Sequence, residues 1–103
     1  MDAPARIRVG PAGWAYDDWR GIVYPEDMPR ARHPLTLLSE WLDTVEINVT
    51  FYRLMAPAQT RRWPDHVAGN PRFAFCAKLW RGLTHDPEPG DLAAATARFL
   101  EGL

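Results

Sequence analysis

"VEINVTFYR", residues 45–53, alternates between apolar and polar side chains more regularly than any other part of the chain. Successive side chains of an extended chain point to opposite faces, so this pattern predicts a strand from about Thr44 to Arg53. The two expected sides are an apolar one of Val45, Ile47, Val49 and Phe51, and a polar one of Glu46, Asn48, Thr50 and Tyr52. The polar side is either a solvated surface or the lining of a site.

Strands and helices are predicted to alternate on both sides of this stretch. "RIRVG" (6–10) and "RFAFCAKLW" (72–80) indicate two further strands, and the turn "GPAG" follows the first of them. Helices are expected in "HPLTLLSEWLD" (33–43), in parts of "PAQTRRWPDHVA" (57–68) with an interruption at Pro64, and in "DLAAATARFLEGL" (91–103) with Asp91 as its N-cap. This order is typical of an α/β fold with a parallel sheet.

Composition limits the classes of protein to consider. A length of 103 residues is that of one domain, and a net charge of −1 with scattered arginines does not imply a nucleic-acid partner. Cys76 is the only cysteine, so an internal disulfide and a CxxC pair are both excluded. The sequence has no apolar run of the roughly 18 residues that a membrane span needs and no signal-peptide core at its start, so we expect a cytoplasmic protein without membrane contact.

Three motifs carry a resemblance to a known family. "VGPAGWAYDDWRGIVYPEDMP", "TVEINVTFYRL" and "FAFCAKLWRGLTH" resemble, in order and spacing, the N-terminal signatures of the YecE-like family, a bacterial and archaeal domain-of-unknown-function family (number seventy-two) with a TIM-barrel-like fold. The family usually has a small hydroxyl residue at the position of Val49 and a proline near Met55. We expect the first difference to alter packing, because Val49 belongs to the predicted apolar side.

The resemblance implies that residues 1–103 are the N-terminal part of a barrel. A complete (β/α)8 barrel takes roughly 250 residues, so this chain corresponds to three or so β/α units and cannot close a barrel alone. We therefore expect a single partial domain with an open sheet that is unstable or self-associating by itself.

In a barrel, one side of each strand faces the surrounding helices and the other faces the interior, with active sites at the C-terminal strand ends. If Val45, Ile47, Phe73 and Phe75 face helices, then Glu46, Asn48 and Lys78 lie inside near that end. The candidate catalytic residues are Glu46, Lys78 and His85, as acid/base, Schiff-base or oxyanion-binding groups. The candidate ligand-binding residues are Asn48, Trp14, Tyr16, Tyr52 and Arg53.

Each candidate has a structural alternative. Glu46 and Lys78 can equally be a buried ion pair that fixes strand register, and Arg53 can pair with an acidic neighbour rather than a phosphate. Cys76 is expected to serve packing only. We expect no metal site, because one glutamate and one histidine do not make a ligand set, and the sequence leaves any cofactor unknown.

Three interpretations of function stay open. The first is an enzyme with a polar pocket at the strand ends that acts on a phosphorylated, sugar-like or nucleotide-like small molecule. The second is a binding or scaffold module without turnover, with nucleic acid as one partner class. The third is a truncated, non-functional fragment.

Overall fold

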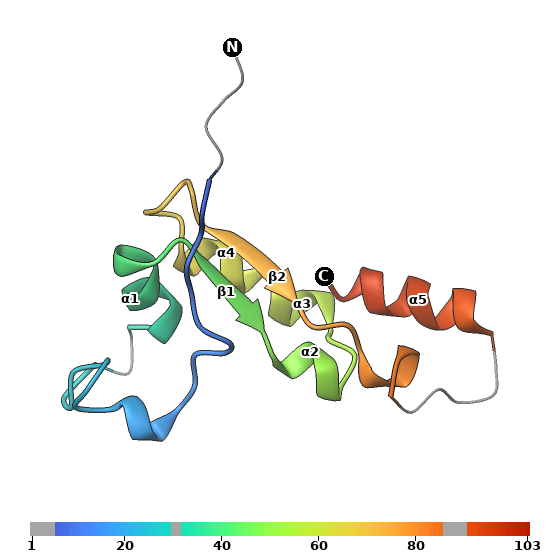
Figure 1. Cartoon of the computed structure of the whole chain (residues 1–103), viewed down its shortest axis with the longest axis horizontal. Helices are drawn as coiled ribbons and strands as arrows, with labels where there is room; N and C mark the ends of the chain where they lie inside the picture. Colours follow the sequence, from blue (N-terminus) through green and yellow to red (C-terminus); the bar gives the residue numbers. More distant parts are fainter. Residues whose placement is uncertain (1–5, 30–31, 86–90) are drawn as a thin grey trace, which may run out of the picture.

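Two short parallel strands form the centre of the fold (Figure 1). The computed structural model describes residues 6–29, 32–85 and 91–103. Strand β1 (Thr44–Ile47) pairs with β2 (Ala74–Ala77) in a register that sets Thr44 opposite Ala74. The remaining elements are α1 (Pro34–Trp41), α2 (Val49–Tyr52), α3 (Pro57–Thr60), α4 (Arg62–His66) and α5 (Leu92–Glu101), with 3-10 turns η1 (Asp17–Trp19) and η2 (Arg81–Leu83). The fold is therefore α/β with an open parallel sheet.

The predicted first strand at residues 6–10 is not formed. Pairing with β1 comes later, at Ala12, which makes a parallel bridge with Glu46, and the Glu46 N–H donates to the Pro11 carbonyl at 2.9 Å. This register places Gly10 opposite Thr44, where β1 begins, so residues 6–9 have no strand beside them. Gly10 also lies against β1 so closely that a Cβ there would be 1.7 Å from the Thr44 carbonyl oxygen.

The predicted strand at residues 45–53 is too long. β1 ends at Ile47, Asn48 has helical angles (φ −87°, ψ −32°), and α2 follows directly. Thr50 explains the turn: it is buried, and its hydroxyl lies 3.0 Å from the Ile47 carbonyl and 2.7 Å from the Lys78 carbonyl. The hydroxyl holds α2 against both strand ends, so Val49 leaves the apolar side on which the alternation placed it.

The helix predictions are confirmed in most respects. Leu35 and Leu38 of α1 are buried as expected, but Trp41 is 59% exposed and does not belong to the core. The helical stretch before β2 is interrupted at Arg61 and not at the predicted Pro64, which lies within α4. Pro64 has no N–H to donate to the Thr60 carbonyl, so the helix breaks one turn before it. The Asp91 carboxylate caps α5, as predicted, by accepting from two backbone N–H groups at 3.0 and 3.3 Å.

The core consists of two small apolar clusters that share Trp14. One contains Tyr24, Leu37 and Leu38, and the other contains Leu35, Val45 and Val67, with Phe73 and Phe75 packed against it. The predicted helix-facing side of the strands is thus confirmed. The tryptophans were expected to be mostly core, yet none of the five is fully buried, and Trp14 is the one that packs against both clusters.

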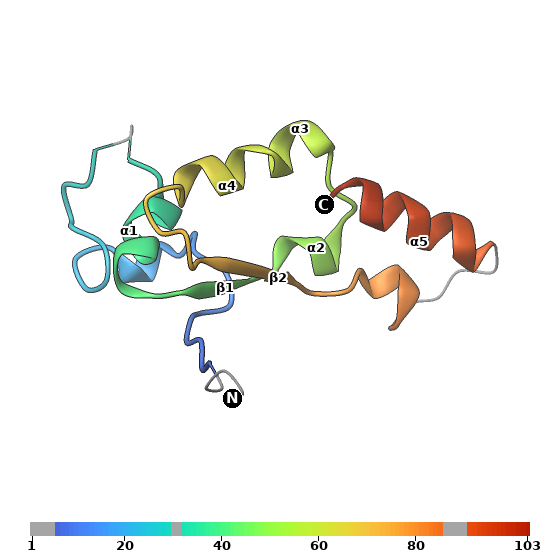
Figure 2. The same ribbon diagram turned by 90° about the horizontal axis from the view of Figure 1, so that it is seen from above.

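The helices gather on one side of the sheet. Figure 2 shows α3 and α4 above β1 and β2, while the described residues place no helix on the opposite face. The radius of gyration is 16.0 Å, against about 13 Å for a compact chain of this length. The face that carries Glu46 is therefore open. No helix among the described residues is long and apolar enough to span a membrane.

Candidate functional site

Glu46 and Lys78 meet at the C-terminal end of the sheet, as the sequence predicts. Glu46 lies on β1, opposite Cys76 of β2, and Lys78 follows β2 by one residue. The Lys78 Nζ is 3.7 Å from Glu46 Oε1, and each side chain is 42% exposed. A buried pair is thus the wrong description. Because exposed ion pairs contribute about 0–1 kcal/mol, this one adds little stability while keeping both charged groups accessible.

Phe51 is the centre of the cluster around this pair. Its ring contacts those of Tyr52 (centroids 5.1 Å apart) and His85 (5.1 Å), and Lys78 Nζ lies 5.9 Å from its centroid. The predicted His85 and Lys78 are therefore both neighbours of the Phe51 ring. The alternation places Phe51 on the apolar, helix-facing side of the predicted strand. Phe51 joins this cluster because β1 ends at Ile47 and Phe51 belongs to α2.

Beside this cluster lies an open hollow of about 320 Å³. Its lining includes four of the five predicted ligand-binding residues: Trp14, Tyr16, Asn48 and Tyr52. Gly13, Ala15 and Val49 complete it. Val49 was expected to affect packing only, but it lines this hollow because it belongs to α2 rather than to the strand. The hollow (the aromatic hollow below) falls within the roughly 300–1,000 Å³ typical of small-molecule sites.

Gly13 joins the aromatic hollow to the ion pair. Its N–H donates to the Glu46 carbonyl at 2.8 Å, which fixes the wall of the hollow on β1. Gly13 has a φ of +79°, and a Cβ there would be 2.6 Å from the Tyr16 hydroxyl oxygen. That hydroxyl donates to the Ala12 carbonyl at 2.5 Å, so the Tyr16 ring is held closely over Gly13. Only glycine fits this position without displacing the ring.

The other candidates lie outside this arrangement or are less constrained. Arg53 is exposed after α2 and is not part of the lining of the aromatic hollow, and no described acidic residue pairs with it. Asn48 does not cap α2, so its amide remains available to the hollow. Cys76 is exposed rather than packed. The described residues contain no group of three or more potential metal ligands.

A pair of histidines supports the far wall of the site. The rings of His33 and His66 stack with centroids 4.0 Å apart, and His33 lies 6.2 Å from the Trp14 ring. His33 Nδ1 also accepts from the Leu35 N–H at 3.1 Å, which caps α1. Burial, followed by repulsion from His66, lowers the pKa of His33. Nothing in the sequence pattern identified this pair, because the two residues are brought together only by tertiary packing.

Tyr24 anchors the same wall from the other side. Its hydroxyl donates to the Trp14 carbonyl at 2.7 Å, and burial raises the pKa of Tyr24 to about 12. The Tyr24 hydroxyl is therefore protonated at neutral pH and serves as a donor to the backbone of the wall. The Trp14 ring also meets the Trp63 ring edge-on, with centroids 5.4 Å apart.

Comparison with known proteins gives one finding. Residues 8–103 match the sequence model of a family described as "Protein of unknown function DUF72". No curated protein and no solved structure matches the chain.

Proposed function

The chain belongs to the DUF72 family, and we propose that its aromatic hollow binds a phosphorylated, sugar-like or nucleotide-like small molecule beside the Glu46–Lys78 pair. One observation carries the proposal. A hollow of ligand size, lined by aromatic and amide side chains, lies at the C-terminal end of a parallel sheet. The accessible Glu46 and Lys78 are not part of its lining, and the hollow is joined to Glu46 through the Gly13 N–H, which donates to the Glu46 carbonyl.

We propose further that the strands belong to a TIM-barrel-like sheet. Two features support this: the β1–β2 pairing is parallel, and the Ala12–Glu46 bridge adds a third segment in parallel on the other side of β1. Chain order and spatial order then agree across the three segments, as in a barrel. The open face that carries Glu46 corresponds in this arrangement to the barrel interior.

The chemistry proposed for the site is acid/base catalysis. Glu46 is the candidate general base, and Lys78 the candidate group that stabilises a developing negative charge. Asn48 orients the substrate from the lining of the hollow. His85 is a second proton carrier: its Nδ1 lies 2.8 Å from the Thr84 hydroxyl, and its exposed ring contacts the Phe51 ring.

Glu46→Gln and Lys78→Met test this role. We expect each variant to lose most of its affinity for adenosine monophosphate or glucose 6-phosphate, the probes we suggest, or to lose turnover of a substrate found in such a panel. The melting temperature should hardly change, because the 3.7 Å pair is half exposed. Arg98→Gln on the exposed surface of α5 is the matched charge control. A large stability loss in both site variants, with unchanged probe affinity, identifies a structural pair instead.

Binding without turnover is the second candidate function. The 61% exposure of Tyr52 favours it, because an exposed aromatic at the rim of a hollow can stack on a ligand that stays partly in solvent. Tyr52→Ala should then weaken probe binding with little effect on folding. Recovery of the bound probe chemically unchanged after long incubation supports this candidate, whereas conversion of the probe supports the enzyme.

We also propose that the chain associates with itself. Several large apolar side chains are exposed, among them Ile22, Leu79 and Leu92, and β2 has an unpaired edge in the described part of the chain. Sedimentation velocity over a wide range of protein concentrations should show species larger than the 11.7 kDa monomer. A single monomeric species throughout that range contradicts this expectation.

A further inference from the structure

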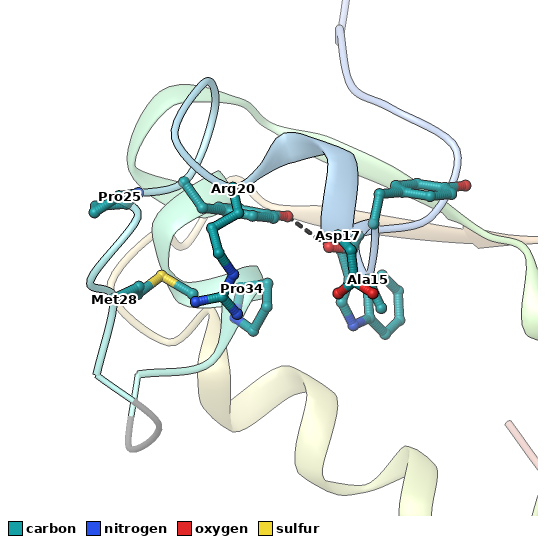
Figure 3. Close-up of a pocket in the computed structure, with 9 residues that line it drawn as sticks. Ala15, Asp17, Arg20, Pro25, Met28 and Pro34 are labelled. Carbon is teal, nitrogen blue, oxygen red and sulfur yellow. Dashed lines mark hydrogen bonds between the residues drawn. The ribbon is translucent and has the colours of Figure 1, made fainter.

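A second hollow, the Arg20 hollow, adjoins the aromatic hollow, and Figure 3 shows the residues that line it. Its volume is about 190 Å³, and it shares the lining residues Trp14, Ala15 and Tyr16 with the larger hollow. This volume is below the roughly 300–1,000 Å³ of a complete ligand site. The Arg20 hollow is therefore of the size expected for one group of a larger ligand.

The Arg20 side chain extends into this second hollow. Figure 3 shows it directed between Met28 and Pro34, which also line the hollow. Its guanidinium makes one hydrogen bond, from Nη1 to the Glu26 carbonyl at 3.1 Å. The ion pairs among the described residues involve other side chains. Since a guanidinium has five N–H donors, most of those on Arg20 remain available to a ligand.

We propose that Arg20 binds the phosphate group of a nucleotide-like ligand whose planar part occupies the aromatic hollow. This inference rests on the proposed function, because it names the ligand class of the same site. The planar fork of a guanidinium matches phosphate oxygens with two parallel charge-assisted hydrogen bonds. Arg20 is exposed, and Met28 and Pro34 line the hollow beside it, so an anion can reach its remaining N–H groups directly from solvent.

Asp17 sets a limit on this site. It lines the same hollow as Arg20 but forms no ion pair with it, and Figure 3 shows the two residues on different sides of the hollow. A carboxylate there repels a phosphate, so Asp17 should weaken phosphate binding. If the hollow instead takes a group that donates hydrogen bonds, Asp17 should strengthen binding. The two possibilities predict opposite effects of Asp17→Asn.

The experiment compares adenosine monophosphate with adenosine by NMR titration of the full chain. The signal to follow is the Trp14 indole N–H, assigned from the spectrum of Trp14→Phe. We expect the monophosphate to bind about tenfold more tightly than adenosine, a typical effect of hydrogen bonds to charged groups. Arg20→Gln should abolish that preference and leave adenosine affinity unchanged, Arg20→Lys should keep part of it, and Arg98→Gln should keep it all.

The outcomes separate this inference from the proposed function. If adenosine monophosphate and adenosine bind with equal affinity and both shift the Trp14 indole N–H signal, the phosphate site is overturned and the aromatic hollow remains a ligand site. A preference for the monophosphate that survives Arg20→Gln likewise overturns the role of Arg20. Weaker monophosphate binding by Asp17→Asn also contradicts it, because we expect a gain of about twofold. If neither probe shifts Trp14, both proposals fail.

Discussion

Thr50→Val tests the turn that places α2 at the strand ends. Thr50 is 1% exposed, and its hydroxyl lies within hydrogen-bond distance of the Ile47 and Lys78 carbonyls. Valine has nearly the same shape but no hydroxyl. The Ile47 carbonyl keeps the Lys78 N–H as a donor at 3.0 Å, whereas the Lys78 carbonyl loses the Thr50 hydroxyl. The variant therefore removes one hydrogen bond and leaves one polar atom without this partner.

The expected cost is about 1–2 kcal/mol, from the lost hydrogen bond and the incomplete solvation of the carbonyl. For a domain of this size, each kcal/mol lowers the melting temperature by roughly 4–8 °C. Urea and thermal unfolding, at one protein concentration for all variants, measure the effect.

Thr96→Val on α5 is the matched control, because the Thr96 hydroxyl also bonds to a backbone carbonyl, that of Leu92 at 2.8 Å, but is exposed. This control should change stability by no more than about 0.5 kcal/mol. Equal effects of the two substitutions would refute the role given to Thr50. A second readout is probe binding, since Thr50 positions the helix that carries Phe51 and Tyr52. Thr50→Val should weaken it, and Thr96→Val should not.

Two further predictions concern the wall of the site. Gly13→Ala should lower the free energy of unfolding by about 1–2 kcal/mol because of its φ of +79°, and by more because the added Cβ collides with Tyr16. Gly21→Ala is the control: its φ is +81° but nothing lies within 4 Å of the added Cβ, so it should show the backbone cost alone. Equal losses of stability in the two variants contradict the close contact between Gly13 and Tyr16. Because its pKa is lowered in the folded state, His33 contributes stability that is complete above a pH of about 6.5 and is lost as the pH falls toward its folded pKa, by at most about 1.4 kcal/mol per pH unit. His33→Asn retains a cap for α1 and should flatten the fall of the urea midpoint below that pH; an unchanged profile contradicts the assignment.

The sequence predicts best those features that depend on local patterns. Helix α5 is specified by Asp91 as its N-cap followed by apolar residues at helical spacing, and α1 is specified by Leu35 and Leu38 at the same spacing. Neither signal needs the rest of the chain. The alternation in Phe73 and Phe75 likewise locates β2, because both residues pack against the apolar cluster beneath the strands, but the strand is Ala74–Ala77 and shorter than the predicted residues 72–80. These signals need only the neighbouring residues in the chain.

Other features depend on partners that are distant in the sequence. Most of residues 45–53 have high strand propensity, with Glu46 and Asn48 as exceptions, but the pairing with β2 ends at Ala77, so the strand ends at Ile47. A threonine at position 50 fits the polar face of a strand, and it also fits a turn as a buried hydrogen-bond donor. The sequence pattern does not distinguish these two roles. The contacts of Phe51 with Lys78 and His85 follow from that turn, and so they could not be predicted from the alternation alone.

The candidate catalytic pair was predictable because its geometry depends on little more than strand register. Parallel strands end at the same edge of a sheet, so a polar residue near the end of each lies close to the other whatever the surrounding packing. In contrast, Arg20 could not be assigned from the sequence, where it is one of many scattered arginines. Its position depends on η1, on the carbonyl of Glu26 and on the approach of Pro34.

Trp14 links the ligand site to the stability of the whole fold. It lines both hollows, packs against both apolar clusters, and its carbonyl accepts the Tyr24 hydroxyl. A ligand that moves this side chain must therefore disturb both clusters, so the wall between the hollows is more rigid than the exposed Tyr52 at the rim. If the aromatic hollow binds a ligand, as proposed, we expect the ligand to adapt to the Trp14 wall and Tyr52 to adapt to the ligand. Trp14→Ala then measures folding and binding together, and Tyr52→Ala is the variant that isolates binding.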